Sequence, residues 1–452
     1  MINDEQLASL NKAIVEDDTL ALEYLVLDIK PVDLAGFIRY QTTQAGLKLL
    51  TYLPLEERAD VFGHLNVVTQ CELAEKMTEE GLSQLFVHMN SDERADLFNE
   101  LAEEKRQSIL RRLAKEERED IRRLASFEEG TTGSIMSSDY VTVVAETNGV
   151  KTNIAQALER VRHTAPNAET IYQVYILNAD QQLAGVLSLR QLILAKPEAT
   201  VDQIMTTELV SINAAEPQEE ASRLISRYDL LALPVIDDNQ RLIGIVTYDD
   251  AMDVAEAEAT EDMHKGASIG PSDEGFGQAT IRNLYSRRVN WLVLLVFANI
   301  LSGAGIAFYE EMIEAYVVLV FFLPLLVASG GNAGSQASTL MIRGLATGDV
   351  GIKDWGKLLV RELIVASFLG LTMALAIVGI GFWRGGIEIA QVVAYSMFII
   401  VIVGSLIGLS LPFVLVKLGW DPATASGPLV TSIADIIGVL IYFAIATSIL
   451  AF

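Results

Sequence analysis

"TSIADIIGVLIYFAIATSIL", residues 431–450, is apolar and long enough to cross a lipid bilayer as a helix. It contains one carboxylate, Asp435, which lies ~10 Å beyond Pro428 along a helix that rises 1.5 Å per residue. A charge at the centre of a membrane helix costs roughly 2.5 to 3.5 kcal/mol, so Asp435 requires a partner. No Lys or Arg lies at a comparable depth, which leaves a bound cation or a protonated acid.

Four further apolar segments precede this one and predict an α-helical membrane domain with five transmembrane helices. The segments lie at about 289–308, 315–342, 357–383, 389–416 and 428–451. Basic residues gather before the first segment, between the second and third, and between the fourth and fifth: Arg282, Arg287, Arg288, Arg343, Lys353, Lys357 and Lys417. Because basic loops stay in the cytosol, this bias predicts cytosolic N-terminal domains and a C-terminus outside.

The second apolar segment ends in small and polar residues, "SGGNAGSQASTLMIRG", residues 329–344. Small residues allow helices to pack closely, whereas Asn332 and its polar neighbours add neutral oxygens that suit the path of a hydrated cation. Carboxylates with neutral oxygens fit Mg²⁺, because a transition-metal path would more often contain Cys, His or Met. Two copies of Asp435 in a symmetric dimer would supply two negative charges. Glu362, beside Arg361, lines the mouth of this path or forms an ion pair.

Charge is segregated along the chain. The net charge is −26, and residues 281–452 contain nine basic and nine acidic residues, so the whole excess belongs to residues 1–280. Such a surface repels nucleic acid and attracts cations, or it serves solubility alone. The start of the chain lacks the pattern of a secretory signal, and the single cysteine, Cys71, excludes an intrachain disulfide.

The acidic N-terminal region, residues 1–280, which we call the front of the chain, contains internal repeats. Residues 5–127 have a helical pattern in which the letters "ERAD" recur 36 residues apart, at 57–60 and 93–96, which predicts stacked helix pairs in an all-α superhelix. From about Ser134 an α+β pattern of short strands and helices occurs twice, with a spacing of roughly 70 residues. We therefore expect five parts, with boundaries at 1–131, 132–200, 201–256, 257–284 and 285–452.

The twice-repeated unit resembles a tandem pair of CBS domains, which are cytosolic regulatory modules that commonly bind adenine nucleotides. The second copy contains "GIVTYDD", residues 244–250, in which Thr247 and Asp250 have the spacing that similar domains use for ribose and phosphate. The first copy has Gln191 in place of the acid. The resemblance therefore implies that ATP or another adenine nucleotide, if one binds, binds at Thr247 and Asp250.

The whole chain resembles the MgtE family of magnesium channels. The resemblance rests on "GGNAGSQASTLMIRGLATGDV" (330–350), "DPA" (421–423) and "ADIIGVLIYF" (434–443), behind the helical front and the CBS pair. It implies a homodimeric, Mg²⁺-selective channel of the bacterial inner membrane, not an enzyme. The pore ion would be held through water by Asp435, with help from the Thr431 carbonyl and Asn332. Many relatives have Asn before the proline of the last loop, where this chain has Gly427.

The resemblance also implies a gate. Cytosolic Mg²⁺ would close the pore by binding between the helical domain, the CBS pair and a connecting plug helix, residues 257–284. The matching acids are Asp92, Asp96, Asp229, Asp250, Asp253, Glu258, Glu261 and Asp262. Acidic surfaces repel one another unless a divalent ion joins them, so a closed assembly can depend on Mg²⁺.

Two other functions compete with a magnesium channel. An anion channel regulated by CBS domains would place basic residues in its pore, whereas the central ionisable residue here is an acid. A proton- or sodium-coupled divalent cation transporter remains open, because an intramembrane carboxylate serves proton relays as well as ion sites. A catalytic function lacks support, since no nucleophile–base motif or P-loop is present.

Overall fold

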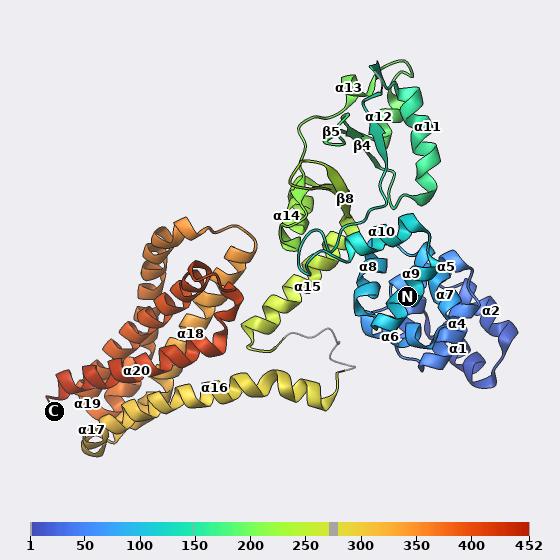
Figure 1. The fold of residues 1–452 in the computed structure, drawn as a ribbon. Coiled ribbons are helices and arrows are strands. Elements are labelled where there is room, and N and C mark those ends of the chain that lie inside the picture. The colour runs from blue at the N-terminus through green and yellow to red at the C-terminus, as the bar shows by residue number, and fades with distance from the viewer. Residues whose placement is uncertain (1, 148, 271–278, 452) are drawn as a thin grey trace. The chain divides into compact units, whose positions relative to one another are not determined.

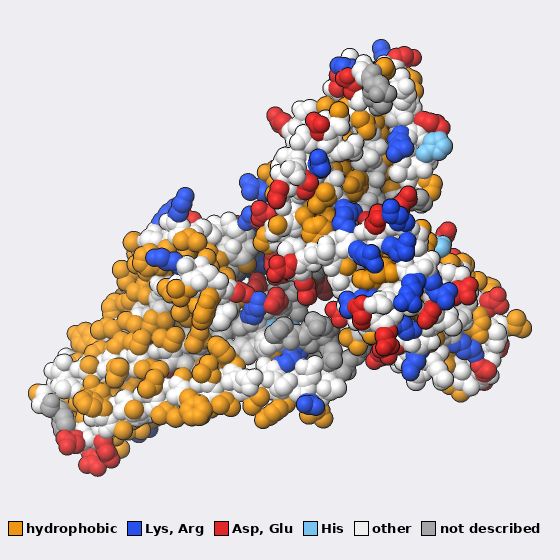
Figure 2. All heavy atoms as spheres, in the orientation of Figure 1, with side chains coloured by type: hydrophobic (Ala, Val, Ile, Leu, Met, Phe, Trp, Pro, Cys, Tyr) orange, Lys and Arg blue, Asp and Glu red, His pale blue; other side chains and the backbone are white. Residues whose placement is uncertain are grey.

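The computed structural model describes residues 2–147, 149–270 and 279–451 (Figure 1). The chain forms two compact units, residues 1–256 and 257–452. On the face shown in Figure 2, hydrophobic side chains cover much of the second unit, whereas acidic and basic side chains are spread over the first. The two units therefore keep the segregation of charge that the composition predicts.

Short helices form the first part of unit one. They are α1 (Asp4–Glu16), α2 (Thr19–Leu27), α3 (Pro31–Ile38), α4 (Thr43–Thr51), α5 (Leu55–Gly63), α6 (Val67–Lys76), α7 (Glu79–His88), α8 (Ser91–Glu100), α9 (Glu103–Arg112) and α10 (Lys115–Leu124). From α2 to α10 each helix contacts the next helix but one, so two rows of helices stack side by side. Their starts follow the sequence, because side chains such as Asn66 and Thr78 accept hydrogen bonds from first-turn N–H groups. The prediction of a helical N-terminal domain is confirmed.

Two small sheets follow, each built from three strands. The first has the order β1 (Thr142–Val144), β4 (Gln173–Leu177), β5 (Leu183–Ser188), and the second has β6 (Ile212–Asn213), β7 (Ala232–Ile236), β8 (Leu242–Thr247). In each sheet the first pair is parallel and the second antiparallel. A short hairpin of β2 (Glu146–Thr147) and β3 (Val150–Lys151) is present only in the first copy among the described residues. The predicted repeat is thus confirmed as two similar α+β modules.

The two modules exchange their leading segments. Ser137, which precedes the first module, pairs with Ile245 of β8, and Thr206, which precedes the second, pairs with Val186 of β5. Each sheet is therefore completed by the segment that starts the other copy.

Helices cover these sheets and connect them. They are α11 (Ile154–Thr164), the 3-10 turn η1 (Ala165–Asn167), α12 (Leu189–Leu194), α13 (Val201–Ile204), α14 (Gln218–Tyr228) and α15 (Tyr248–Gly266). Helix α15 starts directly after β8, so it places the acids of its first turn at the carboxyl end of that strand.

Unit two is helical and apolar. It contains α16 (Ile281–Phe308), α17 (Glu310–Ala315), α18 (Val318–Ala346), η2 (Ile352–Asp354), α19 (Trp355–Lys417), η3 (Pro422–Thr424) and α20 (Gly427–Leu450). Within the described ranges four helices, rather than the five expected, are long and apolar enough to cross a membrane. The difference arises because the expected third and fourth segments both lie in α19.

Helix α19 reverses direction inside its length. Gly386 has φ 75° and ψ −167°, a left-handed conformation that residues with a side chain rarely adopt. A Cβ on Gly370 would lie 2.8 Å from the carbonyl oxygen of Phe398, so the residues before and after Gly386 pack against each other. The element is therefore a hairpin of two arms, 355–385 and 387–417.

Glycines bring α18 and α19 into backbone contact. A Cβ on Gly334 would lie 2.7 Å from the carbonyl oxygen of Gly404, and one on Gly408 would overlap Gly334. Close packing therefore explains the small residues of 329–344, as one interpretation of the sequence predicts. The polar residues of the same segment require another explanation.

Candidate functional site

Six carboxylates converge within unit one. Helix α8 supplies Asp92, Glu93 and Asp96, α15 supplies Asp249 and Asp250, and the segment between η1 and β4 supplies Glu169. Carboxylate oxygens of Glu169, Asp249 and Asp250 lie within 4.8 Å of one another. Asp92 is buried, and its Oδ1 and the Glu169 Oε2 are buried without a hydrogen-bond partner among the described residues. We call these six residues the acidic cluster.

Burial and mutual repulsion disfavour the charged forms of five members of the cluster, Asp92, Glu93, Asp96, Glu169 and Asp250. Burial, followed by the charge of Asp250, raises the pKa of Glu93 to about 8 and holds that of Asp92 well above its usual range. Burial raises the pKa of Glu169 to about 7 and that of Asp250 to about 6. Carboxylates held this close are ionised together only when a cation lies between them.

The nearest basic residue on α8 is engaged elsewhere. The Arg94 guanidinium lies 3.7 Å from Asp120 and 3.6 Å from Asp139. Over residues 2–147, 149–270 and 279–451, no ion pair joins a basic side chain to the acidic cluster. The missing counter-charge is therefore compatible with a divalent cation.

Three of the six residues in the cluster, Asp92, Asp96 and Asp250, are predicted from the sequence. The other three, Glu93, Glu169 and Asp249, are not. Glu93 and Asp249 are sequence neighbours of named residues, so a broader reading of those motifs could have included them. No sequence motif indicates Glu169. It belongs to the first CBS copy, and only the folding of the chain brings it close to the other acids.

Two named acids lie outside the cluster. Asp253 is exposed one turn further along α15. Asp229 is exposed and ends α14 in a left-handed conformation with φ 52°. Its position therefore has a local explanation, since Asp tolerates this conformation better than most residues do.

The predicted nucleotide pair is held together locally. The buried Thr247 hydroxyl donates a hydrogen bond to Asp250 Oδ2. In the first copy the Ser188 hydroxyl donates to Gln191 Oε1 over 2.9 Å. The two copies thus share one interaction, but only the second has an ionisable acid, which belongs also to the acidic cluster.

The second half of α15 carries the remaining named acids, Glu258, Glu261 and Asp262, in unit two. Lys265, which is not among the residues predicted from the sequence, has its ammonium 2.6 Å from both Glu261 and Asp421. Burial, followed by the charge of Asp421, raises the pKa of Asp262. The second half of α15 is therefore bound to the "DPA" loop through Lys265.

Asp435 and Thr431 lie on one face of α20, against α18. A Cβ on Gly331 would lie 2.8 Å from Thr431 Cγ2 and 3.4 Å from Asp435 Oδ1. That Oδ1 is buried and has no hydrogen-bond partner within the described residues. A carboxylate oxygen facing a glycine in a membrane helix is thus free to hold a cation or a proton.

Asn332, the next residue on α18, lines a cavity of about 580 Å³ together with Ser335, Gln336 and Thr339. Asn332, Gln336 and Thr339 are exposed. The structure therefore gathers the neutral oxygens predicted from the sequence on one open face of α18.

The structure explains why a glycine occupies position 427. A Cβ at this position would lie 2.8 Å from the Ser335 hydroxyl, so the glycine lets the start of α20 approach α18 closely. A larger residue there would have to displace Ser335.

Comparisons with known proteins agree along the whole chain. Residues 323–445 match the divalent cation transporter family MgtE, residues 29–130 the MgtE intracellular N domain, and residues 201–257 the CBS domain. The magnesium transporter MgtE of Thermus thermophilus is 37% identical over 98% of both chains. The magnesium transporter MgtE of Bacillus subtilis is 36% identical over 93% of this chain and 92% of its own.

Solved structures resemble the front of the chain. The soluble part of a magnesium transporter has a TM-score of 0.51 and 29% identity, and covers 57% of this chain and 99% of its own. The cytosolic domain of the Mg²⁺ channel MgtE in complex with ATP has a TM-score of 0.51 and 34% identity, and covers 55% of this chain and 99% of its own.

Proposed function

The chain belongs to the MgtE family of magnesium transporters, and we propose that it is a homodimeric channel that admits Mg²⁺ across the bacterial inner membrane. The observation that carries this proposal is the unpartnered oxygen of Asp435 against Gly331. Mg²⁺ keeps several waters and needs only one or two carboxylates, so Asp435, the Thr431 carbonyl and Asn332 form a sufficient ligand set.

The exposed polar face of α18 supports a dimer. Asn332, Gln336 and Thr339 would be costly to expose to hydrocarbon, because lipid offers no hydrogen bonds. A second protomer and a hydrated pore would satisfy them. Each protomer then crosses the membrane five times if the two arms of α19 each span it, with the N-terminal domains in the cytosol and the C-terminus outside.

The acidic cluster supports gating by cytosolic Mg²⁺. With ions bound, the cluster joins α8 to α15 and the pore stays closed. When Mg²⁺ falls, repulsion between the carboxylates separates these helices. Helix α15 runs without interruption from Tyr248 to Gly266, so the element that carries Asp250 also carries Lys265, which binds Asp421. Asp253, Glu258, Glu261 and Asp262 complete the acidic surface of this helix.

A current measurement separates a channel from a coupled transporter. In bilayers with a Mg²⁺ gradient, the reversal potential is expected to follow that gradient alone. It should stay constant when pH or Na⁺ is changed on one side, because a channel moves no second ion in fixed ratio. A shift with pH or Na⁺ would instead favour coupled transport through Asp435.

The second CBS copy is proposed to bind ATP, as the cytosolic domain of the MgtE relative does. Thr247→Ala removes a hydroxyl that would contact the ligand and is expected to weaken ATP binding by about tenfold, the size of one hydrogen bond to a charged group. Calorimetry on the full-length protein at fixed Mg²⁺ measures this change. Ser188→Ala in the first copy is the matched control and should leave the affinity unchanged. An equal loss in both variants would refute the assignment to the second copy.

A further inference from the structure

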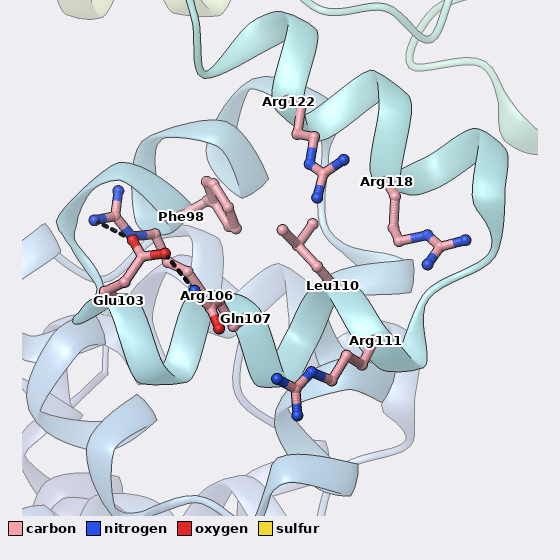
Figure 3. Close-up of a pocket in the computed structure, with 8 residues that line it drawn as sticks. All are labelled: Phe98, Glu103, Arg106, Gln107, Leu110, Arg111, Arg118 and Arg122. Carbon is pink, nitrogen blue, oxygen red and sulfur yellow. Dashed lines mark hydrogen bonds and ion pairs between the residues drawn. The ribbon is translucent and has the colours of Figure 1, made fainter.

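A pocket in the helical domain is lined by arginines, although the front of the chain is strongly acidic. It has a volume of about 460 Å³ and lies among α8, α9 and α10. Figure 3 shows Arg122 reaching from α10 toward Leu110 of α9, whereas the guanidinium of Arg118 turns away from Leu110, and Arg111 lies on the other side of Leu110. The pocket belongs to unit one and shares no lining residue with the acidic cluster or with Thr247.

Three of its arginines lack an acidic partner. Over the described residues no ion pair is formed by Arg111, Arg118 or Arg122, whereas Arg112 and Arg123 of the same helices pair with Glu79 and Asp120. Arg111 and Arg118 have no acid three or four positions away on their helices. Arg122 has Glu119 three positions before it, but the Glu119 carboxylate lies 3.7 Å from the Lys115 ammonium instead.

The arginines of the pocket repel one another. Arg118 and Arg122 are like charges four residues apart on one helix, a spacing at which like charges destabilise a helix. The one acid that lines the pocket is already bound, because Glu103 accepts from Gln107 over 2.9 Å and lies 3.0 Å from Arg106. The pocket therefore has uncompensated positive charge.

The shape and lining of the pocket restrict its ligand. Guanidinium groups recognise phosphate with paired hydrogen bonds, and Phe98 and Leu110 give the pocket an apolar part. Its volume lies within the range of small-molecule sites. A pocket of this size admits a small soluble anion rather than a membrane surface or a nucleic acid.

We propose that this pocket binds a small organic phosphate of the nucleoside diphosphate class, as a second anion site separate from the CBS pair. Arg111, Arg118 and Arg122 hold the phosphates, and Phe98 and Leu110 contact the apolar end of the ligand. This assignment goes beyond the proposed transport of Mg²⁺ and does not depend on nucleotide binding at Thr247.

Calorimetry with ADP on the full-length protein tests the proposal in a Thr247→Ala background, at fixed Mg²⁺. One ADP per chain is expected to bind. Adding Arg118→Gln and Arg122→Gln is expected to weaken binding by more than about tenfold, since two charged donors are lost. Arg112→Gln is the matched control, because its guanidinium lies 3.2 Å from Glu79 and does not line the pocket. Circular dichroism checks that all variants keep their helices.

The outcomes separate this site from the CBS site. Absence of ADP binding in the Thr247→Ala protein, or equal binding after the Arg118 and Arg122 changes, would overturn the proposal. Inorganic pyrophosphate is expected to bind more weakly than ADP, because it lacks the part that contacts Phe98. Equal affinity for the two would overturn the assignment to an organic phosphate. If the affinity for ADP falls with Thr247→Ala but not with the arginine changes, ADP binds at the CBS site and the proposal of a site in the arginine pocket is wrong.

Discussion

Asp435→Asn is expected to abolish Mg²⁺ uptake into proteoliposomes, with a rate at least about a hundredfold below that of the parent protein. The amide keeps the shape of the side chain and one oxygen but removes the negative charge that holds a divalent ion. Asp435→Ala should have the same effect. Uptake is measured with and without Mg²⁺ on the cytosolic side, because the closed state also reduces the rate.

Glu388→Gln is the matched control for this experiment. It also converts an acid to an amide in unit two, but at an exposed position near Gly386. Its uptake should equal that of the parent. Parental uptake by Asp435→Ala in a folded dimer would show that Asp435 serves packing or gating rather than the pore.

The second large effect concerns the acidic cluster. A fragment of residues 1–266 is expected to lose stability as pH rises from about 4 to 8 without divalent ions, by at least about 2 kcal/mol in the free energy of unfolding. Millimolar Mg²⁺ should restore most of this loss by binding the folded form. Thermal unfolding across pH, with EDTA or with Mg²⁺, measures both effects.

The direction of the pH effect follows from the raised pKa values. The folded fragment holds protons on Asp250 up to a pKa of about 6, on Glu169 up to about 7 and on Glu93 up to about 8. The unfolded chain releases these protons near pH 4, so between pH 4 and 8 the folded form binds more protons than the unfolded form. The contribution of these groups to stability is therefore full below pH 4 and is lost as pH rises through 6 to 8.

Asp92→Asn tests the source of this effect. It removes one buried carboxylate and is expected to raise stability at pH 8 in EDTA while reducing the stabilisation by Mg²⁺. Glu116→Gln, at an exposed position on α10, should change neither quantity. The cluster would not be a cation site if Mg²⁺ stabilised the parent and Asp92→Asn equally.

The parts of this protein and their order could be predicted from the amino-acid sequence alone. Apolar runs, the "ERAD" repeat and the doubled CBS pattern depend on composition and spacing along the chain, which are local properties. The importance of Asp435 was evident for the same reason, because the cost of a charge in an apolar helix requires only that helix. The family followed from these features, and the comparisons confirmed it.

Which residues far apart in the sequence contact one another became evident from the folded structure. Glu169 reaches the acidic cluster from another module, and Lys265 reaches Asp421 across 156 positions. The sequence also did not predict that the two sheets exchange their leading segments or that α19 reverses direction at Gly386. Such contacts depend on how packed elements are placed in space, and residue spacing carries no record of that placement. The same reason explains why the arginine pocket among α8, α9 and α10 emerged only when the helices were assembled.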